Sequence, residues 1–123
     1  MSDVNYSITG QVQKGSLSQS FAATGITASM GTAGVLGVTL ALGTATQAIT
    51  TTSLGAVGLC FARNLGTPST HAVTFGRVVS NTLHDAVRLK AGEAALLRLA
   101  PGSYAAKADA AGTTRVVLTI YED

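Results

Sequence analysis

Alternating apolar residues near the end of the chain place the strongest constraint on its fold. Within residues 113–121, Val116, Leu118 and Ile120 occupy every second position. This spacing directs their side chains to one face of a strand. Glycines and a proline separate this run from two shorter apolar runs, at 94–99 and 103–109. Three short strands joined by tight turns predict an antiparallel sheet in this part of the chain.

The rest of the chain repeats this organisation. We expect strands in residues 3–14, 17–30, 35–42, 44–56, 57–65 and 71–79. Gly25 divides residues 17–30 into two short strands, and a loop is the alternative for this segment. Residues 83–86 fit either a short strand or the tip of a hairpin that returns along 86–90. Residues 93–100 have a helix-forming composition, but this segment is short and lies between Gly92 and Pro101, so a strand is predicted. About eight to ten short strands at intervals of roughly 8–12 residues predict one all-β domain over residues 1–123. Its architecture is an antiparallel β-sandwich or a jelly-roll-like barrel.

Apolar positions in the first 30 residues predict how these strands contribute to the core. In residues 3–14, Val4, Tyr6 and Ile8 share one face, and Gly10 is a candidate β-bulge because it has no side chain to pack. Gly15 and Ser16 are expected to turn the chain. The core members expected in residues 17–30 are Leu17, Phe21, Ile26 and Met30.

Charge is scarce, and its distribution is uneven. Charged residues make up 11% of the chain, and none lies between Lys14 and Arg63. A free monomer normally covers its surface with charges. Two explanations fit: a strand-rich domain with an outer face of Thr and Ser, or a domain whose surface is covered by neighbouring molecules.

Several functional classes have no support in the residues. The two histidines, His71 and His84, lack metal-ligand spacing, and no nucleophile motif or paired carboxylate is evident. The glycines of residues 31–43 fit neither a dinucleotide fingerprint nor a P-loop. We therefore predict no enzyme activity, no cofactor and no metal. Eight scattered Lys and Arg residues argue against nucleic-acid binding.

The single cysteine, the N-terminal residues and one apolar run bear on disulfide formation, secretion and membrane insertion. Cys60 is the only cysteine, so a disulfide within the chain is excluded, and its apolar surroundings predict a buried thiol. The residues at the N-terminus lack the features of a secretory signal. The apolar run 35–42 is too short to span a bilayer, so no membrane partner is expected.

The C-terminal half resembles small structural proteins of tailed bacteriophages. The resemblance rests on a strand of the form F-x-R-N-L, followed by a hairpin of the form L-K-x-G-E…L-x-P-G…Y-x-K-A. The matching residues are Phe61, Arg63, Asn64, Leu65, Leu89, Lys90, Gly92, Glu93, Leu99, Pro101, Gly102, Tyr104, Lys107 and Ala108.

The resemblance implies a virion component of β-sandwich type that works as copies in an assembly. The function expected first is a capsid decoration, or cement, protein, made in the host cytoplasm and located on the capsid surface. It would bind the shell of major capsid protein as an oligomer, a trimer being one arrangement. Two alternatives stay open: a tail- or fibre-associated virion protein that contacts the host surface, and a soluble ligand-binding β-barrel with an interior cavity.

Six polar residues are candidates for the interface of such an assembly. Arg63 and Asn64 lie at a strand end, where they would fix the adjacent loop 66–69 or contact a partner; the alternative is that they solvate a turn. Polar contacts at the rim of an interface tune its specificity more than its affinity. The candidates for such rim contacts are Lys90, Glu93, Arg98 and Lys107.

Overall fold

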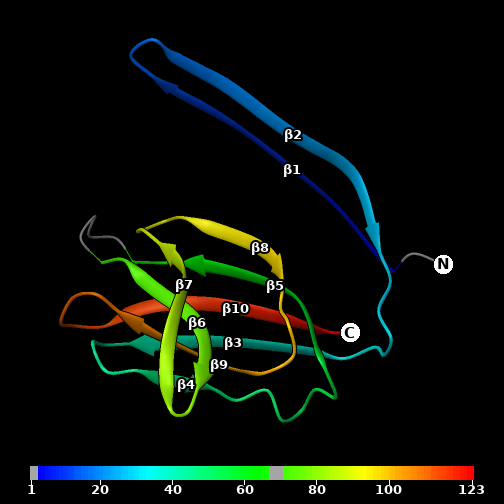
Figure 1. The fold of residues 1–123 in the computed structure, drawn as a ribbon, viewed down its shortest axis with the longest axis vertical. Helices are drawn as coiled ribbons and strands as arrows, with labels where there is room; N and C mark the ends of the chain where they lie inside the picture. Colours follow the sequence, from blue (N-terminus) through cyan, green and yellow to red (C-terminus); the bar gives the residue numbers. More distant parts are fainter. Residues whose placement is uncertain (1–2, 67–70) are drawn as a thin grey trace. The chain divides into compact units, whose positions relative to one another are not determined.

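The computed structural model describes residues 3–66 and 71–123, and the strands of this part of the chain form two units (Figure 1). One unit runs to Gly31 and the other starts at Thr32. The described residues form antiparallel sheets and contain no helix, so the all-β prediction is confirmed. The strands are β1 (Val4–Lys14), β2 (Leu17–Ala28), β3 (Val35–Leu42), β4 (Gln47–Ile49), β5 (Val57–Asn64), β6 (Val73–Val79), β7 (Thr82–Leu89), β8 (Ala94–Arg98), β9 (Ser103–Ala108) and β10 (Thr114–Glu122).

The first unit is a long hairpin of β1 and β2. Its strands pair from Val4 opposite Ala28 to Lys14 opposite Leu17. The tight turn falls at Gly15, as predicted, where φ is 58° and a glycine is favoured.

The irregularity in this hairpin lies at Gly25, and not at Gly10 as the sequence suggested. Between the pairs Tyr6–Ile26 and Ile8–Ala23, β2 contains one residue more than β1. Gly25 takes up this bulge with a φ of 64°, and its backbone N–H donates to Ser7 Oγ at 3.3 Å. Residues 17–28 therefore form one strand with a bulge, and the predicted division into two short strands is wrong.

The second unit is a sandwich of two four-stranded antiparallel sheets. One sheet has the order β3-β10-β5-β8, and the other has the order β4-β9-β6-β7 (Figure 1). The two sheets do not close into a barrel, so the sandwich form of the prediction is the one observed. β10 lies inside its sheet, between β3 and β5, and therefore pairs with strands far away in sequence.

Side chains of both sheets fill the space between them. The alternation predicted for residues 113–121 is confirmed, because Val116, Leu118 and Ile120 are all buried. Leu40 and Leu42 of β3 meet them from the neighbouring strand, as the sequence indicated for residues 35–42. Cys60 of β5 is also fully buried, which confirms that prediction.

Two local expectations are corrected, and one open alternative is decided. Leu17 and Phe21 belong to the hairpin and are exposed, so they are not members of a core. Within residues 44–56, only Gln47–Ile49 form a strand, and bends follow it. The ambiguous residues 83–86 belong to β7, which returns from a two-residue turn at Ser80 and Asn81.

The segment with helix-forming composition is a strand. Residues Ala94–Arg98 form β8, as predicted, and pair with β5 from Leu59 to Arg63. Tertiary pairing outweighs the local helical preference of these residues because the segment is too short to form a stable helix by itself.

Candidate interaction surface

The hairpin has one apolar face and one polar face. Residues that pair across the two strands point to the same side of the sheet, so the register assigns each residue to a face. The bulge at Gly25 is essential here, because without the extra residue Ile26 would point to the side opposite Phe21. The polar face carries Asn5, Thr9, Gln11, Gln13, Ser18, Ser20 and Thr27. The opposite face, called the apolar face here, carries Val4, Tyr6, Ile8, Val12, Leu17, Phe21, Ala23, Ile26 and Ala28, together with Gly10, Gln19 and, at the turn end, Lys14.

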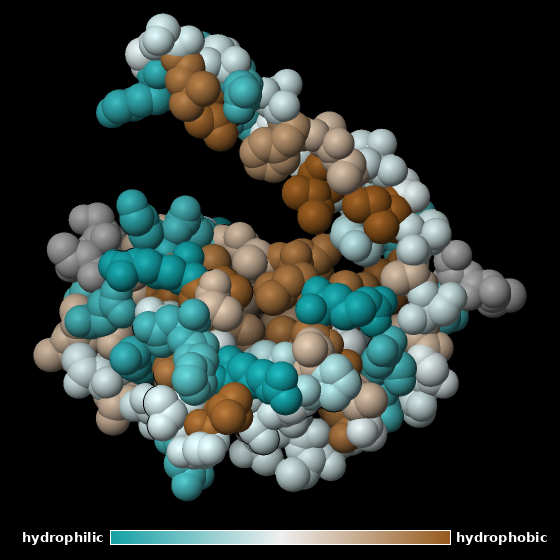
Figure 2. All heavy atoms as spheres, viewed as in Figure 1, coloured by the Kyte–Doolittle hydropathy of each residue, from teal (hydrophilic) through white to brown (hydrophobic). Residues whose placement is uncertain are grey.

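This apolar face is largely open to solvent. Phe21 is 56% exposed, Leu17 47% and Val12 45%, and no residue of β1 or β2 is buried. Figure 2 shows apolar residues in a row along the hairpin, beside hydrophilic ones. An isolated two-stranded hairpin is at best marginally stable in water, and a contiguous exposed apolar patch marks an interaction site. The apolar face of the hairpin is therefore the first candidate interface.

A second candidate lies at one edge of the sandwich, along β3. This strand pairs with β10 on one side only, and the register between the two strands is regular over eight residues. β3 contains no charged residue and no proline. Proteins usually protect free edges with charges, prolines, bulges or short strands. β3 has none of these, and its backbone hydrogen-bonding groups form an open template for another strand.

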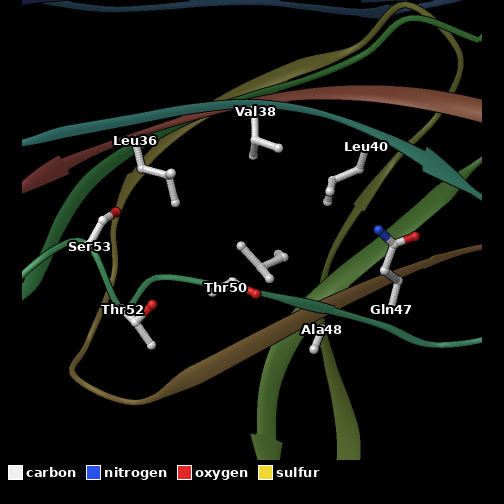
Figure 3. Close-up of a pocket in the computed structure, with 9 residues that line it drawn as sticks. Leu36, Val38, Leu40, Gln47, Ala48, Thr50, Thr52 and Ser53 are labelled. Atoms are coloured by element: carbon white, nitrogen blue, oxygen red, sulfur yellow. The ribbon is translucent and has the colours of Figure 1, made fainter.

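An apolar groove of about 390 Å³ opens beside this edge, between β3 and the segment that contains β4. Figure 3 shows Leu36, Val38 and Leu40 projecting into the groove from β3. Ile49, Thr50 and Thr52 line the groove from the segment that contains β4. The side of the groove that faces β3 is therefore formed by the three-residue strand β4 and the residues that follow it.

Four of the six predicted interface residues come together at one corner of the sandwich. Arg63 and Asn64 end β5, and Lys90 and Glu93 belong to the turn between β7 and β8. The Asn64 backbone N–H donates to the Glu93 carbonyl at 2.9 Å, and the Lys90 N–H donates to Glu93 Oε1 at 2.6 Å. Arg63, Lys90 and Glu93 are exposed, so this corner presents two cations and one carboxylate to solvent.

Asn64 is fully buried beneath this corner. Its Nδ2 donates to the carbonyls of His71 and Leu89, at 2.8 and 3.0 Å. Its Oδ1 accepts a hydrogen bond from the Gly66 N–H at 2.7 Å, at the start of the loop that Asn64 was expected to fix. Residues 67–70 of that loop lie outside the described residues. The Asn64 side chain thus connects three backbone segments of its own chain.

The other two predicted interface residues lie apart from the corner. Arg98, at the far end of β8, forms an exposed ion pair with Asp123 at 2.7 Å. Lys107 is half-buried on β9 of the other sheet, where it pairs with Thr74. Near Lys107, Asp109 binds both Arg88, at 2.8 Å, and the Thr74 hydroxyl, at 3.3 Å. The six residues therefore do not form one continuous polar site.

The reactive side chains do not assemble into a site with evident chemistry. Among residues 3–66 and 71–123, no three His, Cys, Asp or Glu side chains are grouped so that they could hold a metal. Burial raises the pKa of the Cys60 thiol to about 11, which keeps it protonated and unreactive at neutral pH. His71 Nδ1 lies 3.2 Å from the Thr114 hydroxyl. In the part of the chain that the structure describes, no helix has the length and apolar character needed to cross a membrane.

The sequence contained signals for both candidate surfaces that composition alone did not resolve. The alternation was recognised in residues 3–14, whereas in residues 17–30 only candidate core residues were identified, and which side would be covered depends on tertiary contacts. The free edge of β3 follows from the order of strands in the sheet, which local patterns do not determine. Comparison with protein-family models, with curated proteins and with solved structures found no match to this chain.

Proposed function

We propose that this protein is a structural component of a bacteriophage virion: a decoration, or cement, protein that binds the shell of major capsid protein as an oligomer. The observation that carries the proposal is the hairpin, because the apolar side chains on one of its faces, Phe21, Leu17 and Val12 among them, are exposed. Such a face is costly for a free monomer, because apolar area exposed to water loses about 25 cal/mol per Å² relative to burial. In an assembly, the same face contributes directly to binding.

The sandwich is suited to the same role. Antiparallel pairing holds the strands of each sheet, and hydrogen bonds of the buried Asn64 side chain link the end of β5 to the end of β7 in the other sheet. A small rigid body with several separate contact surfaces can bridge neighbouring subunits, and many weak contacts that act together stabilise a shell. We assign the contact with the shell to the corner of Arg63, Lys90 and Glu93, because its exposed charges can select a partner surface.

Binding to capsid shells tests this proposal directly. Purified protein is mixed with shells of the phage that encodes it, prepared without the protein, and the mixture is sedimented. We expect saturable co-sedimentation and a higher melting temperature of the shells. Cryo-electron microscopy of the complex then locates the protein on the shell.

Charge reversal at the corner adds a matched comparison. Arg63→Glu combined with Lys90→Glu is expected to weaken binding to shells. Arg77→Glu, which changes an exposed cation on the other sheet, is expected to bind like the wild type. Absence of binding by the wild-type protein, or its location on the tail alone, would refute the assignment to the capsid.

A further inference from the structure

We propose that β2 of one copy of the chain extends the free edge of β3 in a second copy, so that the apolar face of the hairpin covers the groove between β3 and β4. This inference rests on the proposed function in one respect, which is that the protein forms an oligomer. It names the contact between copies that builds this oligomer. In the single chain, β2 pairs with β1 and β3 pairs with β10, so β2 and β3 belong to different sheets.

The comparison of the four edges of the sandwich identifies β3 as the acceptor. β4 has three residues, and β8 has five and ends in Arg98. β7 carries His84, Asp85 and Arg88 and contains a bulge opposite Gly76. Each of these edges has one of the features that prevent pairing with another chain. β3 has eight residues and none of these features.

The groove beside β3 favours a strand with one apolar face. A strand added to the edge of β3 continues its sheet, and every second side chain of the new strand then points toward Ile49 and the groove. β2 supplies this pattern at three of four positions, because Leu17, Phe21 and Ala23 share the apolar face of the hairpin, and Gln19 between them is polar but uncharged. The groove of about 390 Å³ leaves room for these side chains on the inner side of the sheet that contains β3.

Charge supports β2 of a second copy as the occupant. β2 and β3 both fall between Lys14 and Arg63, where the chain has no charged residue. Neither β2 nor β3 itself would bury an ion, which is the main electrostatic cost of forming an interface. β1, in contrast, ends in Lys14. The donor and the acceptor are present in equal number because they belong to the same chain.

The symmetry of this contact limits the assembly that it can form. The donor strand and the acceptor edge are different surfaces, so the contact is heterologous, and it produces either a closed ring or an open filament. A ring of three copies would satisfy every donor and every acceptor. A closed ring of another size would do the same, so a trimer is one arrangement of this contact.

A charge placed in the groove tests the contact. In Val38→Lys, the ammonium can reach water through the open groove of a single copy, whereas a docked strand would bury it. We expect the wild-type protein to have the mass of three copies by light scattering, and Val38→Lys to have the mass of one. Thr39→Lys puts the same charge on the exposed outer side of β3, and it should keep the mass of the wild type.

Disulfide trapping provides a second measurement that does not depend on the stability of Val38→Lys. A tagged copy with Thr39→Cys is mixed with an untagged copy that carries Ser18→Cys, Ser20→Cys or Ala22→Cys on the outer side of β2. We expect a disulfide between two copies for at least one of these positions. Gln11→Cys on β1 should give none, because a second strand spacing of about 4.8 Å moves it beyond the reach of a disulfide. Cys60 is buried and does not interfere.

The outcomes separate this contact from the proposed function. A wild-type monomer that still binds shells would overturn the contact and leave the proposed function in place. An oligomer that depends on Val38 but does not bind shells would support the contact and overturn the proposed function. Two further results would also overturn the contact. One is a disulfide within a single chain that carries both cysteines, without formation of an oligomer. The other is a disulfide between two copies that forms equally well from Gln11→Cys on β1.

Discussion

The aromatic ring of Phe21 lies over the α-carbon of Gly10, the residue directly opposite it in the hairpin. A Cβ atom at position 10 would overlap the ring, so glycine is the residue that permits this contact. Glycine normally weakens a strand because it has no side chain to pack. An aromatic ring from the neighbouring strand compensates for this loss.

Replacement of Phe21 by Leu should remove the ring from Gly10. In the wild-type protein, the α-protons of Gly10 lie beneath the ring, and their NMR resonances should be shifted upfield. We expect this shift to disappear in Phe21→Leu, while the free energy of unfolding of the sandwich changes by less than about 0.5 kcal/mol. A shift that persists in the variant would show that the ring does not cover Gly10.

Replacement of Asn64 by Ala should destabilise the sandwich strongly. The variant loses three hydrogen bonds and leaves the carbonyls of His71 and Leu89 and the Gly66 N–H without their side-chain partner. Unsatisfied buried groups cost about 1–3 kcal/mol each, so the free energy of unfolding should fall by about 3–5 kcal/mol in urea titrations. The exposed neighbour provides the control: Arg63→Ala should change it by less than about 0.5 kcal/mol. Equal effects of the two substitutions would contradict this role of Asn64.

Stability should decrease with rising pH above about 9, because of Cys60. Burial raises the pKa of the thiol from 9.0 to about 11 in the folded state. Between these values the unfolded chain loses the thiol proton while the folded chain keeps it, so the folded state is progressively disfavoured. The expected loss between pH 9 and pH 11 is about 2 kcal/mol, measured by urea titration. Cys60→Ala should show a smaller decrease over the same range, and identical curves for the two proteins would exclude the thiol as the cause.

Two glycines in strands should respond differently to replacement by Ala. A Cβ at Gly76 would overlap the backbone carbonyl oxygen of His84 at the bulge between β6 and β7, where the main chain has no freedom to move aside. We expect Gly76→Ala to lower the free energy of unfolding by about 3 kcal/mol or more. At Gly37 of β3, no atom lies within 4 Å of the added Cβ, so Gly37→Ala should be neutral or slightly stabilising. Similar melting temperatures for the two variants would contradict the packing at Gly76.

Patterns of period two were sufficient to predict most strands of the sandwich. Val38, Leu40 and Leu42 in β3, and Val116, Leu118 and Ile120 in β10, alternate with residues that are more exposed, and both strands were located correctly. β8 was also predicted as a strand, although its composition favours a helix, because the flanking Gly92 and Pro101 limit its length.

The parts that the sequence did not predict depend on long-range contacts. Phe21 is a large apolar residue and was therefore expected in the core. It lies in a hairpin that forms a separate sheet, which local alternation cannot indicate. The position of the bulge was missed because Gly10 and Gly25 look alike in sequence, and only pairing with β1 distinguishes them. Asn64 was expected at the surface, and its burial follows from backbone carbonyls that different strands bring to it.

The interior position of β10 has a consequence for synthesis of the protein on the ribosome. Val38 of β3 pairs with Leu118, which is synthesised about 80 residues later, and β5 pairs with the same late strand. Neither strand can complete its sheet until residues 114–122 have left the exit tunnel. The nascent chain therefore exposes its uncharged segment until residues 114–122 emerge, and we expect chaperones that hold nascent polypeptides to raise the yield of native protein.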